Sequence, residues 1–309
     1  MNDNLTLRTA DETELDALLE LWTSVFKLDA GVFLTEFRGN PPERRKTYVA
    51  ESDGKLVSSV QIFGLPIGDE WNHPIMIGAV ANVSTLPEFR SRGLSTRLLE
   101  VAISDMEAAG YSWSFLFTGS NSFYERLGWR TIHRSFLKVS LEGIALSEYS
   151  KQIEYRPEPD VRKLRTLAER SFVTPLAQIR TDLDWEFKIP DRLAGKAIFM
   201  SEDVYAVARE KGSEVVIEEW GMPRPTVGDF LNLLVAVASW ARSKGVSNMV
   251  ISAPILPEAR QAIETVFPSV KNVEDVEGMV RPLSPDWPMS RLISFFSLPN
   301  ARFFRLDNF

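Results

Sequence analysis

A short basic segment that contains one glycine has the residue types of a phosphate-binding loop. Its residues are Arg90, Ser91, Arg92, Gly93, Leu94, Ser95 and Thr96. The first N–H groups of a helix lack intrahelical partners and lie at the positive end of the helix dipole, so they can bind a diphosphate. Gly93 permits close approach of the ligand, and Arg90 and Arg92 add guanidinium donors for phosphate oxygens. The segment therefore predicts a site for a ligand that carries a diphosphate.

Such a loop needs a strand before it and a helix after it. Residues 80–86 are apolar and β-branched enough for a strand, which includes Val83, Ser84 and Thr85. After the loop, apolar residues recur at helical spacing: Leu94, Leu98, Leu99, Ala102, Ile103 and Met106. Upstream, the pattern predicts a strand over 5–8, helices over 10–26 and 32–37, and a hairpin of 47–50 with 56–63.

A second segment, residues 118–129, follows a predicted strand over 112–117 and contains Phe123, Tyr124, Gly128 and Trp129. A tyrosine hydroxyl has an ordinary pKa of about 10, so at neutral pH it keeps a proton that it can give to a developing thiolate. A core aromatic residue whose hydroxyl is hydrogen-bonded is the alternative interpretation. The segment makes Tyr124 a candidate general acid.

The two segments together resemble the two signatures of the GCN5-related N-acetyltransferase (GNAT) superfamily. Arg90, Gly93 and Ser95 match R-x-x-G-x-[GAS], and residues 123–129 match F-Y-x-x-x-G-[FYW]. The resemblance implies acetyl-CoA as co-substrate, with its phosphates on residues 90–96. It further implies that the pantetheine arm lies between two splayed strands, beside residues 83–85, and that Tyr124 protonates the leaving thiolate.

The composition of the chain argues against several other kinds of site and partner. The chain of 309 residues has no cysteine and two histidines, which leaves little for a metal, and its net charge of −7 argues against a nucleic-acid surface. No leader or membrane span is expected, so the sequence predicts a cytoplasmic protein without a membrane partner. An acidic cleft would concentrate a cationic substrate. The sequence leaves formation of a homo-oligomer open.

The second half of the chain repeats the first. Placing Gly93 on Gly228 superposes a helix, its glycine stop and the following strand, so the sequence predicts an α/β fold made of two GNAT-like domains, each with a mixed sheet flanked by helices. We expect a catalytic domain over 1–145 and a degenerate one over 146–309. The second copy has Pro225 where the first has Arg90, and proline removes a donor amide. It therefore lacks the phosphate-binding loop and would shape the acceptor pocket.

The run from Gly119 to Trp129, with Tyr124 and Arg126, and the degenerate second copy resemble the enhanced-intracellular-survival (Eis-like) acetyltransferases. That resemblance implies amine acceptors such as aminoglycosides or lysine side chains, with the tyrosine as acid and the terminal carboxylate as base. Here the last residue is Phe309, and Asp307 is the alternative base. A loop over 64–71 offers Asp69 and Glu70 as further amine-binding candidates, although surface acids are usually only solvated.

These features favour an N-acetyltransferase that moves an acetyl group from acetyl-CoA to a primary amine by direct attack. The acceptor would be a small molecule, a compound like an aminoglycoside or polyamine, or lysine. Two alternatives remain: a non-catalytic acyl-CoA-binding regulatory module, and a transferase of a different acyl group, since the sequence does not show the pocket volume that sets acyl-chain length.

Overall fold

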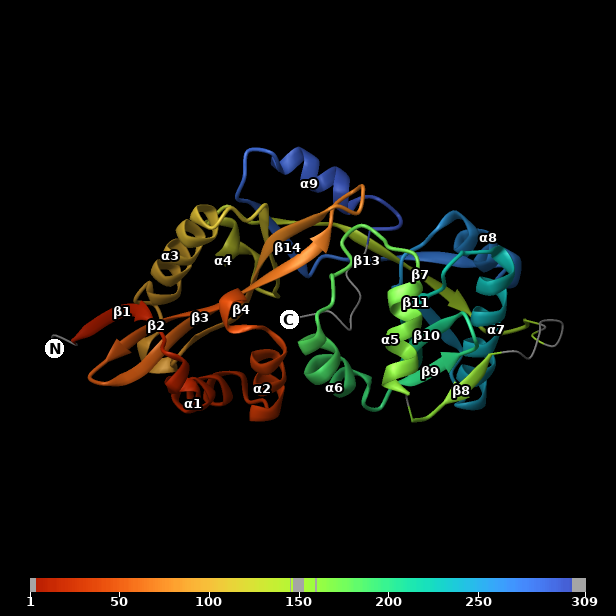
Figure 1. Cartoon of the computed structure of the whole chain (residues 1–309), viewed down its shortest axis with the longest axis horizontal. Helices are drawn as coiled ribbons and strands as arrows, with labels where there is room; N and C mark the ends of the chain where they lie inside the picture. Colours follow the sequence, from red (N-terminus) through yellow and green to blue (C-terminus); the bar gives the residue numbers. More distant parts are fainter. Residues whose placement is uncertain (1–3, 145, 147–152, 159, 302–309) are drawn as a thin grey trace.

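The computed structural model describes residues 4–144, 146, 153–158 and 160–301. Two seven-stranded mixed sheets lie along the long axis of the molecule, and helices flank each of them (Figure 1). This arrangement confirms the predicted α/β fold with a mixed sheet in each half. Within the described part of the chain, no helix has both the length and the apolar character needed to cross a membrane.

The first sheet contains, in spatial order, β1 (Leu5–Thr9), β2 (Arg45–Ser52), β3 (Lys55–Gly68), β4 (Pro74–Thr85), β5 (Trp113–Phe117), β14 (Gly278–Pro282) and β6 (Arg130–Thr131). The second contains β13 (Val270–Asp275), β7 (Arg134–Ser140), β12 (Asn248–Ile251), β11 (Glu214–Gly221), β10 (Tyr205–Lys211), β9 (Ala197–Met200) and β8 (Glu154–Arg156). The α-helices are α1 (Leu15–Phe26), α2 (Ala30–Gly39), α3 (Leu94–Ala108), α4 (Asn121–Glu125), α5 (Val161–Arg170), α6 (Ile189–Leu193), α7 (Val227–Ser243), α8 (Pro257–Val266) and α9 (Met289–Phe296).

Each sheet contains one parallel strand pair joined through a helix. In the first sheet β4 leads through α3 to β5, and in the second β11 leads through α7 to β12. The sequence alignment of Gly93 with Gly228 agrees with this repeat, because both glycines lie at the start of the connecting helix. The repeated unit has the order strand, helix, parallel strand, which is the part of the fold that forms the predicted loop.

Two strands cross the domain boundary expected at residue 145. That boundary places the strand near residues 135–141 in the first domain, but β7 pairs with β12 and β13 of the second sheet. In return β14 enters the first sheet between β5 and β6. Strand β6 has only two residues, so it cannot satisfy the buried backbone groups along β5, and β14 supplies those hydrogen bonds. The division into domains at this residue stays a prediction.

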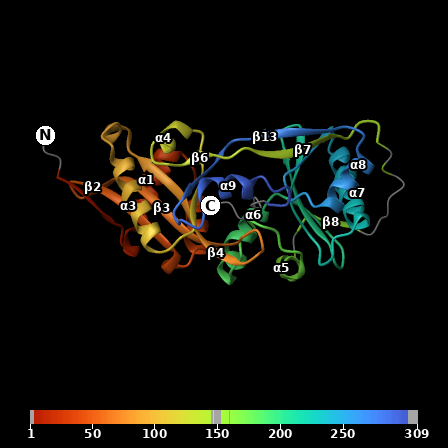
Figure 2. The same cartoon turned by 90° about the horizontal axis from the view of Figure 1, so that it is seen from above.

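Helix α3 packs on the first sheet with the apolar face that the sequence predicted. All six predicted core residues of this helix are buried. Helices α1 and α2 lie on the other side of the sheet from α3 (Figure 1). Helix α9 lies at the junction of the two halves (Figure 2). Its Phe296 packs on Trp113 with ring centroids 5.3 Å apart. Strands β4 and β5 and the loop before α3 are therefore held between packed layers.

The loop expected over residues 64–71 is shorter than predicted. Strand β3 continues to Gly68, and the chain turns back into β4 at Pro74. Asp69 forms the turn by accepting hydrogen bonds from the N–H groups of Trp71 and His73, both at 2.8 Å. Glu70 pairs with Arg291 at 2.8 Å. Of these two candidates for amine binding, Asp69 thus has its partners in this hairpin, whereas Glu70 has a partner in α9 and its Oε2 has none among the described residues.

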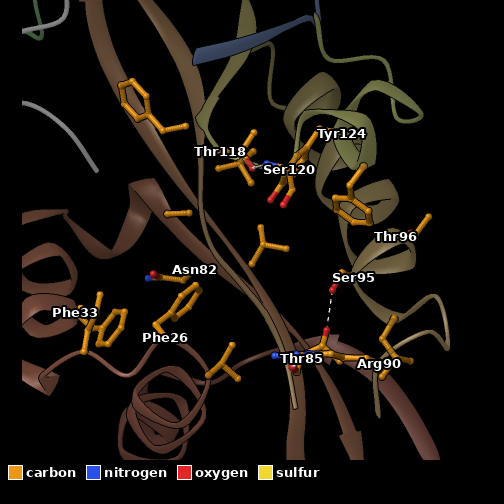
Figure 3. Close-up of a pocket in the computed structure, with 18 of the residues that line it drawn as sticks. Phe26, Phe33, Asn82, Thr85, Arg90, Ser95, Thr96, Thr118, Ser120 and Tyr124 are labelled. Carbon is orange, nitrogen blue, oxygen red and sulfur yellow. Dashed lines mark hydrogen bonds between the residues drawn. The ribbon is translucent and has the colours of Figure 1, made fainter. Parts of the chain in front are cut away.

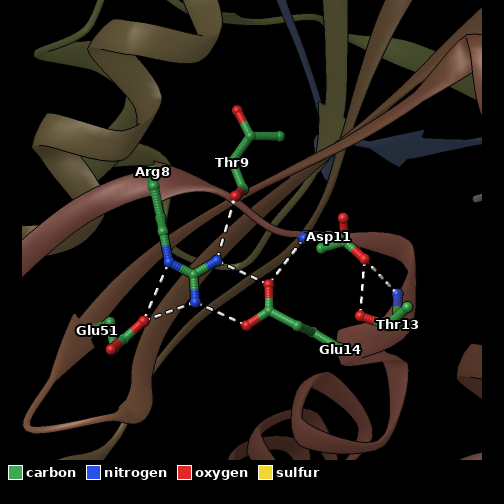
Figure 4. Close-up of polar contacts among 6 residues, drawn as sticks. All are labelled: Arg8, Thr9, Asp11, Thr13, Glu14 and Glu51. Atoms are coloured by element: carbon green, nitrogen blue, oxygen red, sulfur yellow. Dashed lines mark hydrogen bonds and ion pairs between the residues drawn. The ribbon is translucent and has the colours of Figure 1, made fainter.

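An arginine with two carboxylate partners ties the first strand to the start of α1 (Figure 4). Arg8 contacts Glu14 at 2.7 Å and Glu51 at 2.6 Å. Glu14 also accepts a hydrogen bond from the N–H group of Asp11, whose own side chain accepts from the N–H group of Thr13. The cluster fixes β1, β2 and the helix start in one place.

We expect Arg8→Gln to lower the free energy of unfolding by about 1 kcal/mol at pH 7, since partly exposed ion pairs contribute little each. The hydrogen bonds from Arg8 hold the pKa of Glu14 below its ordinary value. A lowered folded-state pKa gives stability above the ordinary pKa that is lost as pH falls through the folded one. The difference between the two proteins in urea unfolding should therefore shrink at pH 3. Arg38→Gln, at an exposed helix position, is the control, and an equal difference at both pH values would contradict this account.

Candidate active site

The parallel strands β4 and β5 part soon after they begin to pair. They pair only at Gly78 with Ser114 and at Ala79 with Phe115, although β4 continues to Thr85. From Val80 onward the edge of β4 that faces β5 has no strand partner within the described residues. Free backbone donors and acceptors on such an edge can pair with an extended ligand.

The same stretch of β4 contains a bulge. Ser59 of β3 pairs with Ser84 and Gln61 pairs with Ala81, so Asn82 and Val83 together lie opposite Val60. Asn82 has a φ of 49°, which is uncommon outside glycine. Its side-chain amide donates to Gln61 Oε1 at 2.6 Å, and Gln61 in turn donates to Thr47 Oγ1 at 3.1 Å. The bulge and this buried chain of amides fix how the Asn82 side chain is turned.

The loop between β4 and α3 leaves the start of the helix open. Gly93 occupies the N-cap position with a φ of 73°, and neither a capping side chain nor an acidic residue satisfies the first turn. Ser91 also has a positive φ, at 60°. Ser95 Oγ lies 2.7 Å from Thr85 Oγ1, which connects the helix start to the end of β4 (Figure 3). The N–H groups of the first turn are thus available to an anion.

One cavity of about 1160 Å³ joins the strand gap, the open helix start and the region between α1 and α2. In Figure 3, Phe26, Phe33 and Asn82 are drawn at one end of it, and Ser95, Thr96 and Tyr124 at the other. Most of the residues predicted to bind cofactor line it: Val83, Thr85, Arg90, Ser91, Gly93, Leu94, Ser95 and Thr96. The structure thus brings together residues from β4, the loop and α3.

Two of the predicted residues do not line this cavity. Ser84 is buried, with its hydroxyl 2.9 Å from that of Ser59, because neighbouring strand residues point to opposite faces. The guanidinium of Arg92 lies over the ring of Phe89, 4.8 Å from its centroid, and donates to the carbonyl of Glu88. Arg90 does line the cavity and donates to the carbonyl of Thr85 at 3.2 Å. The two arginines of the loop therefore occupy different surroundings.

Tyr124 lies in the short helix α4 beside the strand gap. It is 9% exposed and packs edge-on against Trp129 and Phe123, with centroids 6.0 and 4.9 Å away. Burial raises its pKa to about 12, because the low-dielectric surroundings disfavour the ionised form. Among the described residues its hydroxyl has no hydrogen-bond partner. The side chain thus keeps its proton at neutral pH and can donate it into the cavity.

The predicted base lies beyond what the structure describes. Phe309, and the alternative Asp307, fall within 302–309, outside the described residues. The cavity residues that were not predicted as site residues include Glu36 of α2, Asn82 of β4, Arg126 after α4 and Arg192 of α6. Arg126 lies within the second segment, which is a signal that could have found it. Glu36 and Arg192 come from elements that only the tertiary fold brings to the cavity.

The helix start in the second half differs from that in the first. The hydroxyl of Thr226 accepts from the N–H group of Asp229 at 3.2 Å, and Asp229 places a negative charge in the first turn of α7. The first turn of α7 is thus capped by its own side chains, whereas that of α3 is open. An anion would meet repulsion there, as the replacement of Arg90 by Pro225 in the alignment already suggested.

A comparison with protein-family models matches residues 6–132 to an acetyltransferase (GNAT) domain. This match covers less than half of the 309-residue chain. The match covers β1 through β6 and includes the open loop, the strand gap and Tyr124. The GNAT domain thus contains most of the cavity, and the second half adds Arg192 to it.

Solved structures share the fold of the whole described chain. A probable N-acyltransferase from Enterococcus faecalis V583 has a TM-score of 0.70 at 15% identity, over 91% of this chain and 73% of that one. Eis1 from Mycobacterium abscessus has a TM-score of 0.68 at 13% identity, over 90% of this chain and 73% of that one. A GCN5-related N-acetyltransferase from Kribbella flavida has a TM-score of 0.64 at 18% identity, over 91% of this chain and 71% of that one. None of the curated proteins matches the sequence.

Proposed function

We propose that the protein transfers an acetyl group from acetyl-CoA to a primary amine. The observation that carries the proposal is the single cavity that joins an uncapped helix start, an unpaired strand edge and the hydroxyl of a buried tyrosine. The three features suit, in order, the diphosphate, the amide-rich arm and the thioester sulfur of one elongated cofactor. A GNAT domain supports this reaction class.

In the proposed reaction the neutral amine attacks the thioester carbonyl carbon and the C–S bond breaks. The sulfur is protonated as it departs, so coenzyme A leaves as the thiol. The N–H groups along the free edge of β4 are suited to hydrogen-bond the carbonyl oxygen as it gains charge. Tyr124 donates the proton to sulfur. The carboxylate of Phe309, proposed from the resemblance to Eis-like enzymes, takes the proton from the amine. Holding both reactants in one cavity contributes through proximity.

The proposed binding of acetyl-CoA is tested by comparing the two arginines of the loop. We expect Arg90→Glu to weaken binding of acetyl-CoA about tenfold or more, because Arg90 lines the cavity, and Arg92→Glu to weaken it only about two- to threefold. Calorimetric titration of the folded proteins measures both dissociation constants. Thiol release with a panel of amines then reports turnover. A wild-type protein that is folded and binds no acetyl-CoA would refute the proposed function.

A further inference from the structure

Only one oxygen of the Glu36 carboxylate has a hydrogen-bond partner among the described residues. Its side chain is 15% exposed and lines the cavity between α1, α2 and β4. One oxygen, Oε1, accepts a hydrogen bond from the guanidinium of Arg192, which reaches over from α6 of the second half. The other oxygen, Oε2, is buried and has no hydrogen-bond partner among the described residues. A buried carboxylate oxygen without a donor is costly, so a donor from a ligand would be strongly favoured there.

The protein holds this carboxylate in place from both halves. Lys188, in the π-helix over Asp184–Lys188, packs its stem so closely on Gly39 of α2 that a Cβ there would lie 2.2 Å from the Lys188 Cγ atom. The π-helix packs on α2 through this contact and leads directly into α6, which brings Arg192 to Glu36. A charge fixed in this way can contribute to the choice of ligand.

Large apolar side chains surround the same end of the cavity and remain exposed. Phe26, Leu28 and Val32 are 38%, 51% and 50% exposed, and all three line the cavity. Figure 3 shows Phe26 and Phe33 together at the end opposite Ser95 and Thr96. Single exposed apolar residues need no explanation, but a group of them around the mouth of a cavity marks a binding surface.

We infer that the acceptor is an amphiphilic amine, whose N–H group binds the Glu36 carboxylate while an aromatic or aliphatic body rests on Phe26, Leu28 and Val32. This inference rests on the proposed function and adds the class of acceptor to it. A polyhydroxylated amine fits this end poorly, because the apolar rim would remove water from its hydroxyl groups without supplying hydrogen-bond partners. Glu36 is thus a specificity-determining residue of the acceptor site.

The test measures binding of three small compounds to the full chain saturated with coenzyme A, and again without it, by calorimetry at pH 7. The compounds are 2-phenylethylamine, its neutral analogue 2-phenylethanol, and glucosamine as a polyhydroxylated amine. We expect 2-phenylethylamine to bind about tenfold or more tightly than either of the others, because only it offers both a charged donor and an apolar body.

Variants separate the two parts of this site. Glu36→Gln should weaken binding of 2-phenylethylamine about tenfold and leave that of 2-phenylethanol unchanged, because it removes only the charge. Leu28→Ser should weaken binding of both compounds severalfold, because it removes apolar contact area. Glu43→Gln, an exposed glutamate that does not line the cavity, is the matched control and should change neither. The dissociation constant of acetyl-CoA, measured on each preparation, reports whether the variant is folded.

Equal affinity of wild-type protein for glucosamine and 2-phenylethylamine, or an unchanged affinity of Glu36→Gln for the latter, would overturn the inference. So would a wild-type protein that binds none of the three compounds. These outcomes differ from failure of the proposed function, which would appear as absence of acetyl-CoA binding. Leu28 is exposed, so its variant gives a result even if Glu36→Gln does not fold.

Discussion

Replacing Tyr124 by phenylalanine should lower kcat about 10²- to 10⁴-fold and leave the affinity for acetyl-CoA nearly unchanged. The substitution removes only the hydroxyl, while the ring that packs on Trp129 and Phe123 is kept. A positioned general acid contributes to the rate by about this factor. Steady-state kinetics and calorimetry on the same preparation separate the loss of turnover from a loss of binding.

Tyr111→Phe is the matched control, because it removes the same atom from a half-buried tyrosine that does not line the cavity. It should leave kcat unchanged. Because burial raises the pKa of Tyr124 to about 12, this residue stays protonated throughout the usual assay range. Any loss of kcat between pH 8 and 10 must therefore come from another group. Full turnover by the Tyr124→Phe enzyme would assign the proton donor elsewhere.

We expect Gly93→Asp to weaken acetyl-CoA binding about 100-fold while the protein stays folded. Asn and Asp tolerate the left-handed conformation better than other non-glycine residues, and a Cβ at Gly93 would meet no heavy atom within 4 Å. The new carboxylate would lie beside the open N–H groups of α3 and repel a diphosphate there. The variant would give α3 an acidic start like that of α7, where Asp229 lies in the first turn.

Gly93→Asn separates charge from shape, since it adds a side chain of nearly the same size without the charge. Its effect on the dissociation constant should be about tenfold smaller than that of Gly93→Asp. Because the difference between the two variants is electrostatic, it should narrow at high salt. Two variants with equal dissociation constants would show that the phosphates bind away from this helix start.

The sequence predicted those parts of the site that depend on short stretches of chain. The apolar spacing of α3 and the glycine at its start are local patterns, and both are found where they were expected. The direction in which each side chain points depends also on its neighbours in the folded structure. The sequence assigned Arg90 and Arg92 the same role in binding phosphate, yet only Arg90 lines the cavity, because Phe89 provides a ring on which Arg92 stacks.

Contacts between the halves could not be predicted from local pattern. Glu36 and Arg192 are separated by a long stretch of sequence and meet because the π-helix before α6 packs on α2. The bulge at Asn82 depends on the pairing of β4 with β3, and no residue pattern predicted it. The exchange of β7 and β14 between the sheets also depends on pairing partners that lie far apart in sequence. Each of these features is decided by tertiary packing.

The exchanged strands have a consequence for the order in which the protein can be made. A ribosome delivers β5 and β6 early, but β14, which lies between them, leaves only after nearly all of the second half. Strand β7 likewise cannot pair until its neighbours β12 and β13 have been synthesised. Neither sheet can close while the chain is still short, so nascent chains expose open strand edges for most of synthesis. Closure of both sheets is therefore a late and shared event, and the pairings that complete it span a large part of the chain, which makes them slow to form.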